Sequence, residues 1–238
     1  MARVLVVTPT YNEADNLEAF VRALFGAVPD AHVLVVDDGS PDGTGKIADR
    51  LAGSDERVRV LHRGGKLGIG TAYLDGFRFG LREGYDVLVQ MDTDLSHDPA
   101  HLPAMLRAIE EGADVVLGSR NIAGGGVRGW GLGRHVLSKG GSLYSRTILG
   151  LSIRDLTSGY KAFRREVLEG LDLASIRSEG YSFQIEMTWR ALRGGFSVVE
   201  VPIVFVDRRA GESKMSRQIF LEAVAMVWKL RLDQVRHR

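Results

Sequence analysis

Two aspartates with one residue between them follow a short, largely apolar run of the sequence. Asp92 and Asp94 flank Thr93, and the preceding Val87–Met91 is typical of a buried strand. Carboxylate oxygens are the ligands that hard divalent cations prefer, and a cation held by such a pair can bridge a diphosphate. The alternative is a simple turn in which Asp94 caps the next helix. The strand-end position, beside a second acidic pair, favours the metal site.

The second acidic pair, Asp37 and Asp38, ends the predicted strand His32–Asp37. A carboxylate at this place in a mononucleotide-binding half can accept hydrogen bonds from a base or a ribose. The alternative is a turn or a helix N-cap, which Asp42 would supply equally well.

The glycine-rich segment Gly124–Gly129 matches the dinucleotide-binding pattern G-x-G-x-x-G, but its context does not fit that role. Trp130 rather than a helix follows it, and no acidic residue appears about 20 residues later. The sequence also has no Walker A motif. Dehydrogenase and P-loop interpretations are therefore disfavoured.

Positive charge is concentrated in one stretch of the chain. Residues 115–154, called the acid-free segment below, contain six Lys or Arg and no Asp or Glu, although 30 acidic residues in 238 predict about five in 40. The six are Arg120, Arg128, Arg134, Lys139, Arg146 and Arg154. Such segregated charge favours an anionic partner. A solvated basic surface is the alternative, and it suits Arg120, placed at a strand end, least.

The composition is that of an ordinary globular protein: 238 residues, 45% hydrophobic and 26% charged. The absence of cysteine excludes disulfides, thiolate zinc sites and cysteine nucleophiles. The N-terminal apolar stretch is shorter than the ~7 to 15 residues of a signal peptide, and Ile219–Leu232 is interrupted by charges and shorter than the ~20 residues that span a bilayer. We therefore expect neither a leader peptide nor a transmembrane helix.

Strand and helix patterns alternate through the first half, which predicts an α/β fold with a mostly parallel sheet. The expected strands are Val4–Thr8, His32–Asp37, Val58–His62, Val87–Met91 and Val115–Ser119, with helices over Leu17–Leu24, Thr44–Leu51, Thr71–Arg82 and Leu102–Glu110. Ligands bind outside the carboxyl ends of such strands, so the following loops should share one rim.

After Arg120 the alternation stops. A glycine-rich loop, helices over His135–Leu149 and Gln184–Leu192, a strand over Val198–Val206 and a terminal helix are expected. With no linker or repeat, one domain is the simplest account, with residues 1–120 as its nucleotide-binding half and residues 121–238 completing it.

Several motifs together resemble the inverting nucleotide-sugar glycosyltransferases of GT-A fold, and within them the dolichyl-phosphate (polyprenyl-phosphate) mannosyltransferases. The general resemblance rests on segments 9–13, 36–44, 66–73, 91–97 and 118–120, and the closer one on segments 134–140, 155–160, 180–186 and 208–214. These motifs cover nearly the whole chain in family order.

The resemblance implies a role for individual residues. The positions matching those that hold the guanosine are Pro9, Tyr11, Glu13, Val36 and Asp38, with Thr93 also contacting the nucleotide. Asp92 and Asp94 match the pair that binds Mg²⁺ or Mn²⁺. Ser96 stands where well-known members have a glutamine metal ligand, and a water could replace the missing amide. The phosphate-binding and acceptor-side positions are Arg120, Arg134, Ser138, Arg208 and Lys214, the last two on a loop expected to act as a lid.

The implied chemistry agrees with the charge pattern. A lipid monophosphate is mostly ionised near neutral pH, because its second pKa is about 6, so it needs no catalytic base. The reaction instead needs cations, here the metal, Arg120 and its neighbours, that gather the phosphates and stabilise the leaving diphosphate.

The implied reaction is transfer of mannose from GDP-mannose to a polyprenyl phosphate, with inversion to a β-linked product. The expected location is the cytoplasmic face of a membrane, bound peripherally, with the terminal helix either interfacial or packed on the domain. A membrane-anchor subunit is compatible with the sequence, and no nucleic acid partner is expected. The alternatives are transfer of glucose from UDP-glucose to such a lipid, sugar transfer to a growing polysaccharide, and a non-catalytic nucleotide-binding module.

Overall fold

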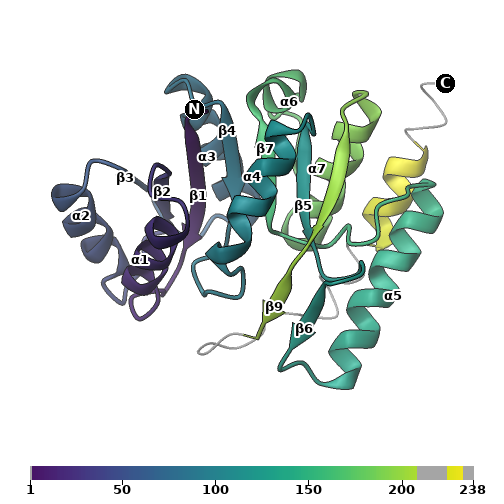
Figure 1. Ribbon diagram of the computed structural model, residues 1–238, viewed down its shortest axis with the longest axis horizontal. Coiled ribbons are helices and arrows are strands. Elements are labelled where there is room, and N and C mark those ends of the chain that lie inside the picture. Colours follow the sequence, from purple (N-terminus) through teal and green to yellow (C-terminus); the bar gives the residue numbers. More distant parts are fainter. Residues whose placement is uncertain (1, 208–223, 233–238) are drawn as a thin grey trace.

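The protein is an α/β domain in which helices cover both faces of a central sheet (Figure 1). The computed structural model describes residues 2–207 and 224–232. The strands are β1 (Val4–Thr10), β2 (His32–Asp37), β3 (Val58–His62), β4 (Val87–Gln90), β5 (Val115–Ser119), β6 (Gly126–Arg128), β7 (Lys161–Arg164), β8 (Val198–Pro202) and β9 (Val204–Val206). The helices are α1 (Leu17–Ala27), α2 (Thr44–Ser54), α3 (Ile69–Arg82), the 3-10 helix η1 (Pro99–His101), α4 (Leu102–Glu110), α5 (Leu132–Leu149), α6 (Arg165–Gly170) and α7 (Gly180–Arg193), and residues 224–232 are also helical.

The main sheet has seven strands in the order β3-β2-β1-β4-β7-β5-β8. Its pairs are parallel except for those of β7, which runs antiparallel to both β4 and β5. The predicted mostly parallel α/β fold is therefore confirmed. β6 and β9 pair with each other in a separate two-stranded parallel ribbon.

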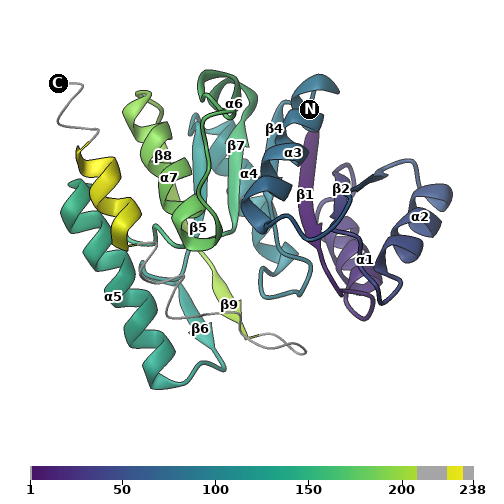
Figure 2. The same cartoon turned by 180° about the vertical axis from the view of Figure 1, so that it is seen from behind.

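Each face of the sheet packs against its own set of helices. Helices α1, α2 and α4 cover one face, while α3, α6 and α7 cover the other, seen from behind in Figure 2. Helix α3 lies especially close to the sheet, because a Cβ on Gly76 would stand only 2.2 Å from Val7 Cγ1 and one on Gly80 only 2.4 Å from Leu88 Cδ2. This close approach fixes α3 firmly against β1 and β4.

The antiparallel strand β7 was not predicted from the sequence. It is four residues long with a charged residue at each end, so it shows neither an apolar run nor an alternating pattern. Lys161, its first residue, is in register with Gln90 on β4 and Leu117 on β5. The loop before β7 consequently reaches the same rim as the loops that follow the parallel strands.

The predicted strand over Val198–Val206 is in fact two strands. Ile203 separates β8, which pairs with β5, from β9, which pairs with β6. The predicted glycine-rich loop contains β6, and α5 and α7 begin three and four residues earlier than the helices expected from His135 and Gln184. Residues 224–232 pack through Val227 and Leu230, which belong to the main core, while Trp228 and Leu232 are exposed.

Candidate active site

The Asp92-Thr93-Asp94 turn leaves β4 at the rim and is nearly buried. Thr93 and Asp94 are 2% and 6% exposed, whereas the Asp92 side chain is 26% exposed. Asp92 Oδ1 accepts a hydrogen bond from the Tyr73 hydroxyl at 2.7 Å. The backbone N–H of Asp92 donates to His97 Nδ1 at 3.1 Å, and the His97 ring stacks on Tyr160. The turn is thus fixed from both sides while one carboxylate faces the solvent.

Residues just after the aspartates have an unusual conformation. Leu95 has a φ of 59°, a left-handed geometry that costs a non-glycine residue about 1–3 kcal/mol and gathers at functional sites. It lets the N–H of Ser96 donate to Asp94 Oδ1 at 3.0 Å. The Ser96 hydroxyl is itself buried and has no hydrogen-bond partner among the described residues.

These residues fit a hard divalent cation. They offer two carboxylates and a buried hydroxyl, which are oxygen donors of the kind that Mg²⁺ and Mn²⁺ take. The part of the chain that the structure describes holds no cluster of three or more Asp, Glu or His at metal-binding distance. Two carboxylates with substrate phosphates and water are the usual environment of such an ion rather than a complete protein cage.

The predicted nucleotide residues surround the ends of β1 and β2. Thr93 Oγ1 bonds Thr8 Oγ1 at 2.7 Å and donates to the Pro9 carbonyl at 3.3 Å, so the two predicted contacts Pro9 and Thr93 lie together. Lys66 Nζ lies 4.3 Å from the centre of the Tyr11 ring. Val36 is fully buried within β2.

Glu13 lies in the loop between β1 and α1, on the same rim. Its side chain accepts a hydrogen bond from Asn16, and its N–H donates to Thr44 Oγ1 at 2.9 Å.

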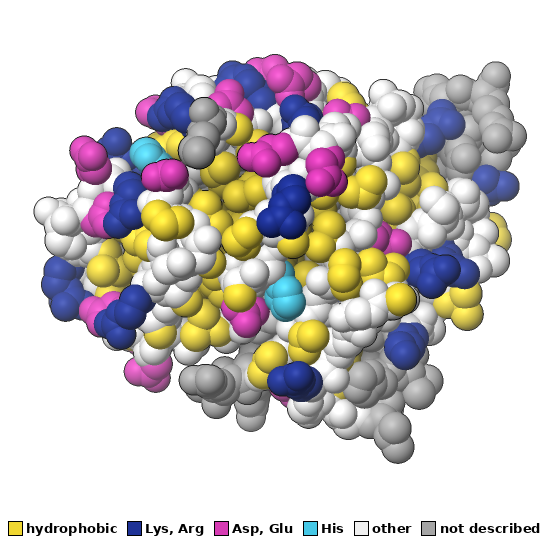
Figure 3. Space-filling model, in the orientation of Figure 1, with side chains coloured by type: hydrophobic (Ala, Val, Ile, Leu, Met, Phe, Trp, Pro, Cys, Tyr) yellow, Lys and Arg dark blue, Asp and Glu magenta, His cyan; other side chains and the backbone are white. Residues whose placement is uncertain are grey.

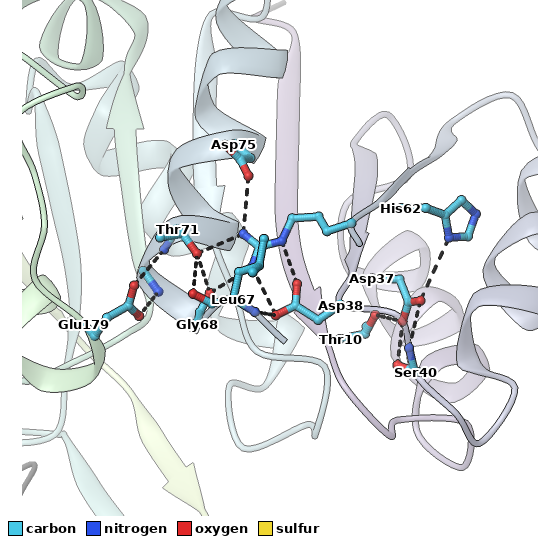
Figure 4. Close-up of polar contacts among 12 residues, drawn as sticks. Thr10, Asp37, Asp38, Ser40, His62, Leu67, Gly68, Thr71, Asp75 and Glu179 are labelled. Carbon is cyan, nitrogen blue, oxygen red and sulfur yellow. Dashed lines mark hydrogen bonds and ion pairs between the residues drawn. The ribbon is translucent and has the colours of Figure 1, made fainter. Parts of the chain in front are cut away.

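The two aspartates at the end of β2 are held by different partners, as Figure 4 shows. Asp37 accepts from the hydroxyls of Thr10 and Ser40. Asp38 Oδ1 and Oδ2 accept from Arg63 Nε at 2.7 Å and Nη2 at 3.1 Å, and this ion pair is almost completely buried.

Asp38 therefore anchors the loop between β3 and α3. Its Oδ2 also accepts from the Leu67 N–H, while Arg63 donates to the Gly68 carbonyl. The predicted contact of Asp38 with the guanosine stays a prediction. Arg63 was not among the predicted site residues, although it directly follows a predicted strand.

Arg120 follows β5 and is 8% exposed. Its Nε and Nη2 donate to Asp155 Oδ2 and Oδ1, both at 2.7 Å, and Nη2 also donates to Thr157. Most of this guanidinium is thus committed to Asp155, which the sequence analysis had included only within segment 155–160 and without a role of its own.

The other predicted phosphate residues lie either on α5 or outside the described residues. Arg134 and Ser138 lie in the first half of α5, with Ser138 half-buried. Arg208 and Lys214 lie outside the described residues. Figure 3 shows Lys and Arg side chains over the α5 side of the molecule with few acidic neighbours, whereas both charges mix over the α1 and α2 side. The charge segregation predicted from the acid-free segment is therefore visible on this surface.

A buried polar group lies beneath the site and was also missed. Lys161 is fully buried, and its Nζ donates to the Gln184 carbonyl at 2.6 Å. The Gln90 amide, which neighbours Lys161 in register, and Gln184 Oε1 are buried without partners among the described residues. Burial lowers the pKa of Lys161 to about 7. Its only signal in the sequence was a lysine between Tyr160 and the apolar pair Ala162 and Phe163.

None of the helices in the described ranges, 2–207 and 224–232, has both the length and the apolar character needed to cross a bilayer.

Comparisons with known proteins identify the family. The sequence model of glycosyl transferase family 2 matches residues 5–172. A polyprenol monophosphomannose synthase from Mycolicibacterium smegmatis is 54% identical, covering 98% of this chain and 90% of that protein. An undecaprenyl-phosphate mannosyltransferase from Micrococcus luteus is 52% identical, covering 94% and 92%.

Among solved structures, a glucosyl-3-phosphoglycerate synthase from Mycobacterium tuberculosis, in complex with Mn²⁺, UDP-glucose and phosphoglyceric acid, has the same fold. Its TM-score is 0.69 at 23% identity, covering 95% of this chain and 80% of that chain. With the fold, the Asp92–Asp94 turn and these relatives in agreement, the chain belongs to glycosyl transferase family 2.

Proposed function

We propose that this enzyme transfers mannose from GDP-mannose to a polyprenyl monophosphate, giving polyprenyl phosphate β-mannose and GDP. The observation that carries the proposal is identity above 50% over nearly the full length to two proteins named for mannose transfer to such lipids. The arrangement of the rim suits this reaction. Asp92 and Asp94, after β4, lie at the same end of the sheet as Arg120, after β5.

Asp92, Asp94 and the Ser96 hydroxyl are the proposed ligands of Mg²⁺ or Mn²⁺. The ion would supply positive charge to a diphosphate at this rim. Tyr73 fixes one oxygen of Asp92, and the Ser96 N–H fixes one of Asp94, so neither carboxylate has to reorganise when the donor binds.

The two halves of the chain are assigned different substrates. Residues 1–120 would hold the nucleotide through Pro9, Tyr11, Glu13, Val36, Asp38 and Thr93. Residues 121–238 would hold the acceptor phosphate through Arg134, Ser138, Arg208 and Lys214, with Arg120 between the halves. No general base is needed, because the attacking phosphate is already ionised. The basic residues would instead stabilise the leaving diphosphate.

Membrane contact is assigned to residues 224–232 at the cytoplasmic face. Trp228 and Leu232 are 50% and 56% exposed, and Lys229 beside them is exposed too. An apolar side with a tryptophan and basic neighbours suits a membrane interface. Flotation with anionic liposomes tests this assignment, and a Trp228→Ser variant that floats as well as the parent would reject it.

The reaction is tested with purified protein, radiolabelled GDP-mannose, Mn²⁺ or Mg²⁺ and a polyprenyl phosphate. We expect labelled lipid to form from GDP-mannose but not from UDP-glucose, and to disappear with a chelator. Product from UDP-glucose alone would replace the proposed donor, and an absence of product with either donor would support the non-catalytic alternative.

Carboxamide variants locate the chemistry. Asp92→Asn and Asp94→Asn should each lower turnover by about 10²–10³-fold, the range seen when a transition-state charge contact is removed. Asp98→Asn is the matched control, because Asp98 lies in the same turn region but its side chain caps η1 through the Ala100 N–H. Equal losses in all three variants would argue against the assignment.

A further inference from the structure

The tyrosine beneath the aspartate turn makes a polar contact that its packing does not require. Tyr73 is fully buried in the main core, yet its hydroxyl reaches Asp92 Oδ1 at 2.7 Å. A phenylalanine would fill the same apolar space without this hydrogen bond. The hydroxyl therefore has a role that concerns the carboxylate rather than the core.

Tyr73 is held so firmly that it can hold Asp92 in turn. Its ring stacks on Phe183 of α7, with centroids 6.2 Å apart and planes 4° from parallel, and also on Phe77. The close approach of α3 to the sheet at Gly76 leaves the helix little room to shift.

The start of α3 is also tied to the start of α7. Glu179 Oε2 accepts from the Gly70 N–H at 2.9 Å, and Oε1 accepts from the Thr71 N–H at 3.3 Å (Figure 4). A Cβ on Gly70 would lie 2.7 Å from the Ser178 carbonyl, so the two chain segments touch directly. Two elements that are distant in sequence thus fix the Tyr73 hydroxyl.

A donor aimed at one oxygen of a carboxylate selects a single orientation of that carboxylate. Metal ligands are commonly oriented by such outer hydrogen bonds, and losing one typically costs about 10–100-fold in metal affinity or activity. The tyrosine hydroxyl is the donor in this hydrogen bond, because an ionised carboxylate can only accept.

We infer that Tyr73 is a positioning residue that orients the Asp92 carboxylate for the divalent cation. This inference rests on the proposed metal-dependent function. It predicts a defect in metal affinity, which a purely structural tyrosine would not produce.

The experiment measures Mn²⁺ binding by isothermal titration calorimetry in the presence of GDP. Tyr73→Phe keeps both ring stacks and should weaken Mn²⁺ binding about 10–100-fold. The Mn²⁺ concentration for half-maximal turnover should rise in parallel, and saturating Mn²⁺ should restore most of the rate.

Tyr85→Phe is the matched control. Tyr85 is also buried and its hydroxyl bonds His32 at 2.7 Å, at the opposite end of the sheet from Asp92. The control should lose thermal stability but bind Mn²⁺ like the parent.

Phe183→Leu serves as a second variant should Tyr73→Phe fold poorly, because it loosens the ring while keeping the hydroxyl, and a smaller loss of Mn²⁺ affinity is expected. Parental affinity in the folded Tyr73 or Phe183 variant, or an equal loss in the Tyr85 control, would overturn the inference. A parent protein that binds GDP but no Mn²⁺ would instead overturn the metal assignment itself, and this inference with it.

Discussion

Arg120 and Asp155 form a bidentate ion pair in which both side chains are buried. Nε–Oδ2 and Nη2–Oδ1 are both 2.7 Å, and the two side chains are 7% and 0% exposed. Asp155 Oδ2 also accepts from the Arg120 N–H at 2.9 Å. The aspartate comes from the loop before β7, so the antiparallel strand brings the counter-ion to the end of β5. A guanidinium proposed for phosphate binding is thereby held in place before any substrate arrives.

Breaking this pair from one side should be costly. Asp155→Ala leaves a buried, uncompensated guanidinium, and we expect the free energy of unfolding to fall by about 3–5 kcal/mol in urea denaturation. The double variant Arg120→Met/Asp155→Leu should lose much less than the sum of the single changes. Additive losses would show that the two side chains are not energetically coupled.

The double variant also separates folding from chemistry. If it folds but loses mannose transfer, Arg120 acts on the substrates, whereas full activity would remove it from the phosphate site.

The sequence predicted most of the parallel half of the fold. Strands β1, β2, β4 and β5 are buried on both faces or nearly so, whereas the edge strand β3 exposes Arg59 and His62. Apolar runs with polar ends mark the buried strands and the rim. The aspartate turn after β4, and its place on the same rim as the loop after β1, follow from that pattern, whereas Pro9 and Thr93 were singled out only by the family resemblance.

Contacts that depend on β7 and on the starts of α3 and α7 could not be predicted in the same way. Lys161–Arg164 has too short and too polar a pattern, and the partners of Arg120 and Tyr73 are 35 and 19 residues away in sequence. Single-sequence periodicity reports which face is buried, but not which polar atoms meet there.

Lys161 should make stability depend on pH in a recognisable way. Its pKa falls from 10.5 to about 7 on burial, so between these values the unfolded chain binds more protons than the folded one. The contribution of Lys161 to the free energy of unfolding therefore becomes more favourable as the pH rises from about 7 towards 10. The change is at most about 1.4 kcal/mol per pH unit. Lys161→Met should be more stable than the parent at pH 7, and the difference should shrink towards pH 9.5.

The measurement is urea denaturation of both proteins at several pH values. Lys46→Met, which changes an exposed lysine on α2, is the control and should leave the pH profile unchanged. Parallel profiles for the parent and Lys161→Met would mean that the lysine keeps its proton at neutral pH and above.

The Ser96→Ala variant should affect thermal stability and Mn²⁺ affinity differently. Its hydroxyl is buried and lacks a partner among the described residues, so Ser96→Ala removes an unpaired polar group. We expect thermal stability in a chelator to be unchanged or to rise by up to about 1 kcal/mol, since an unsatisfied buried group costs about 1–3 kcal/mol. Mn²⁺ affinity in the presence of GDP should fall, because the hydroxyl, or a water that it holds, is one of the proposed ligands.

Ser158→Ala provides the comparison, because that serine is equally buried but donates to the Gly118 carbonyl at 2.6 Å. Its loss should lower stability by about 1–3 kcal/mol and leave Mn²⁺ affinity intact. The two serines thus predict opposite patterns in the same pair of assays. If Ser96→Ala instead destabilises the protein and binds Mn²⁺ normally, its hydroxyl has a structural partner in solution and the cation is held by Asp92 and Asp94 without it.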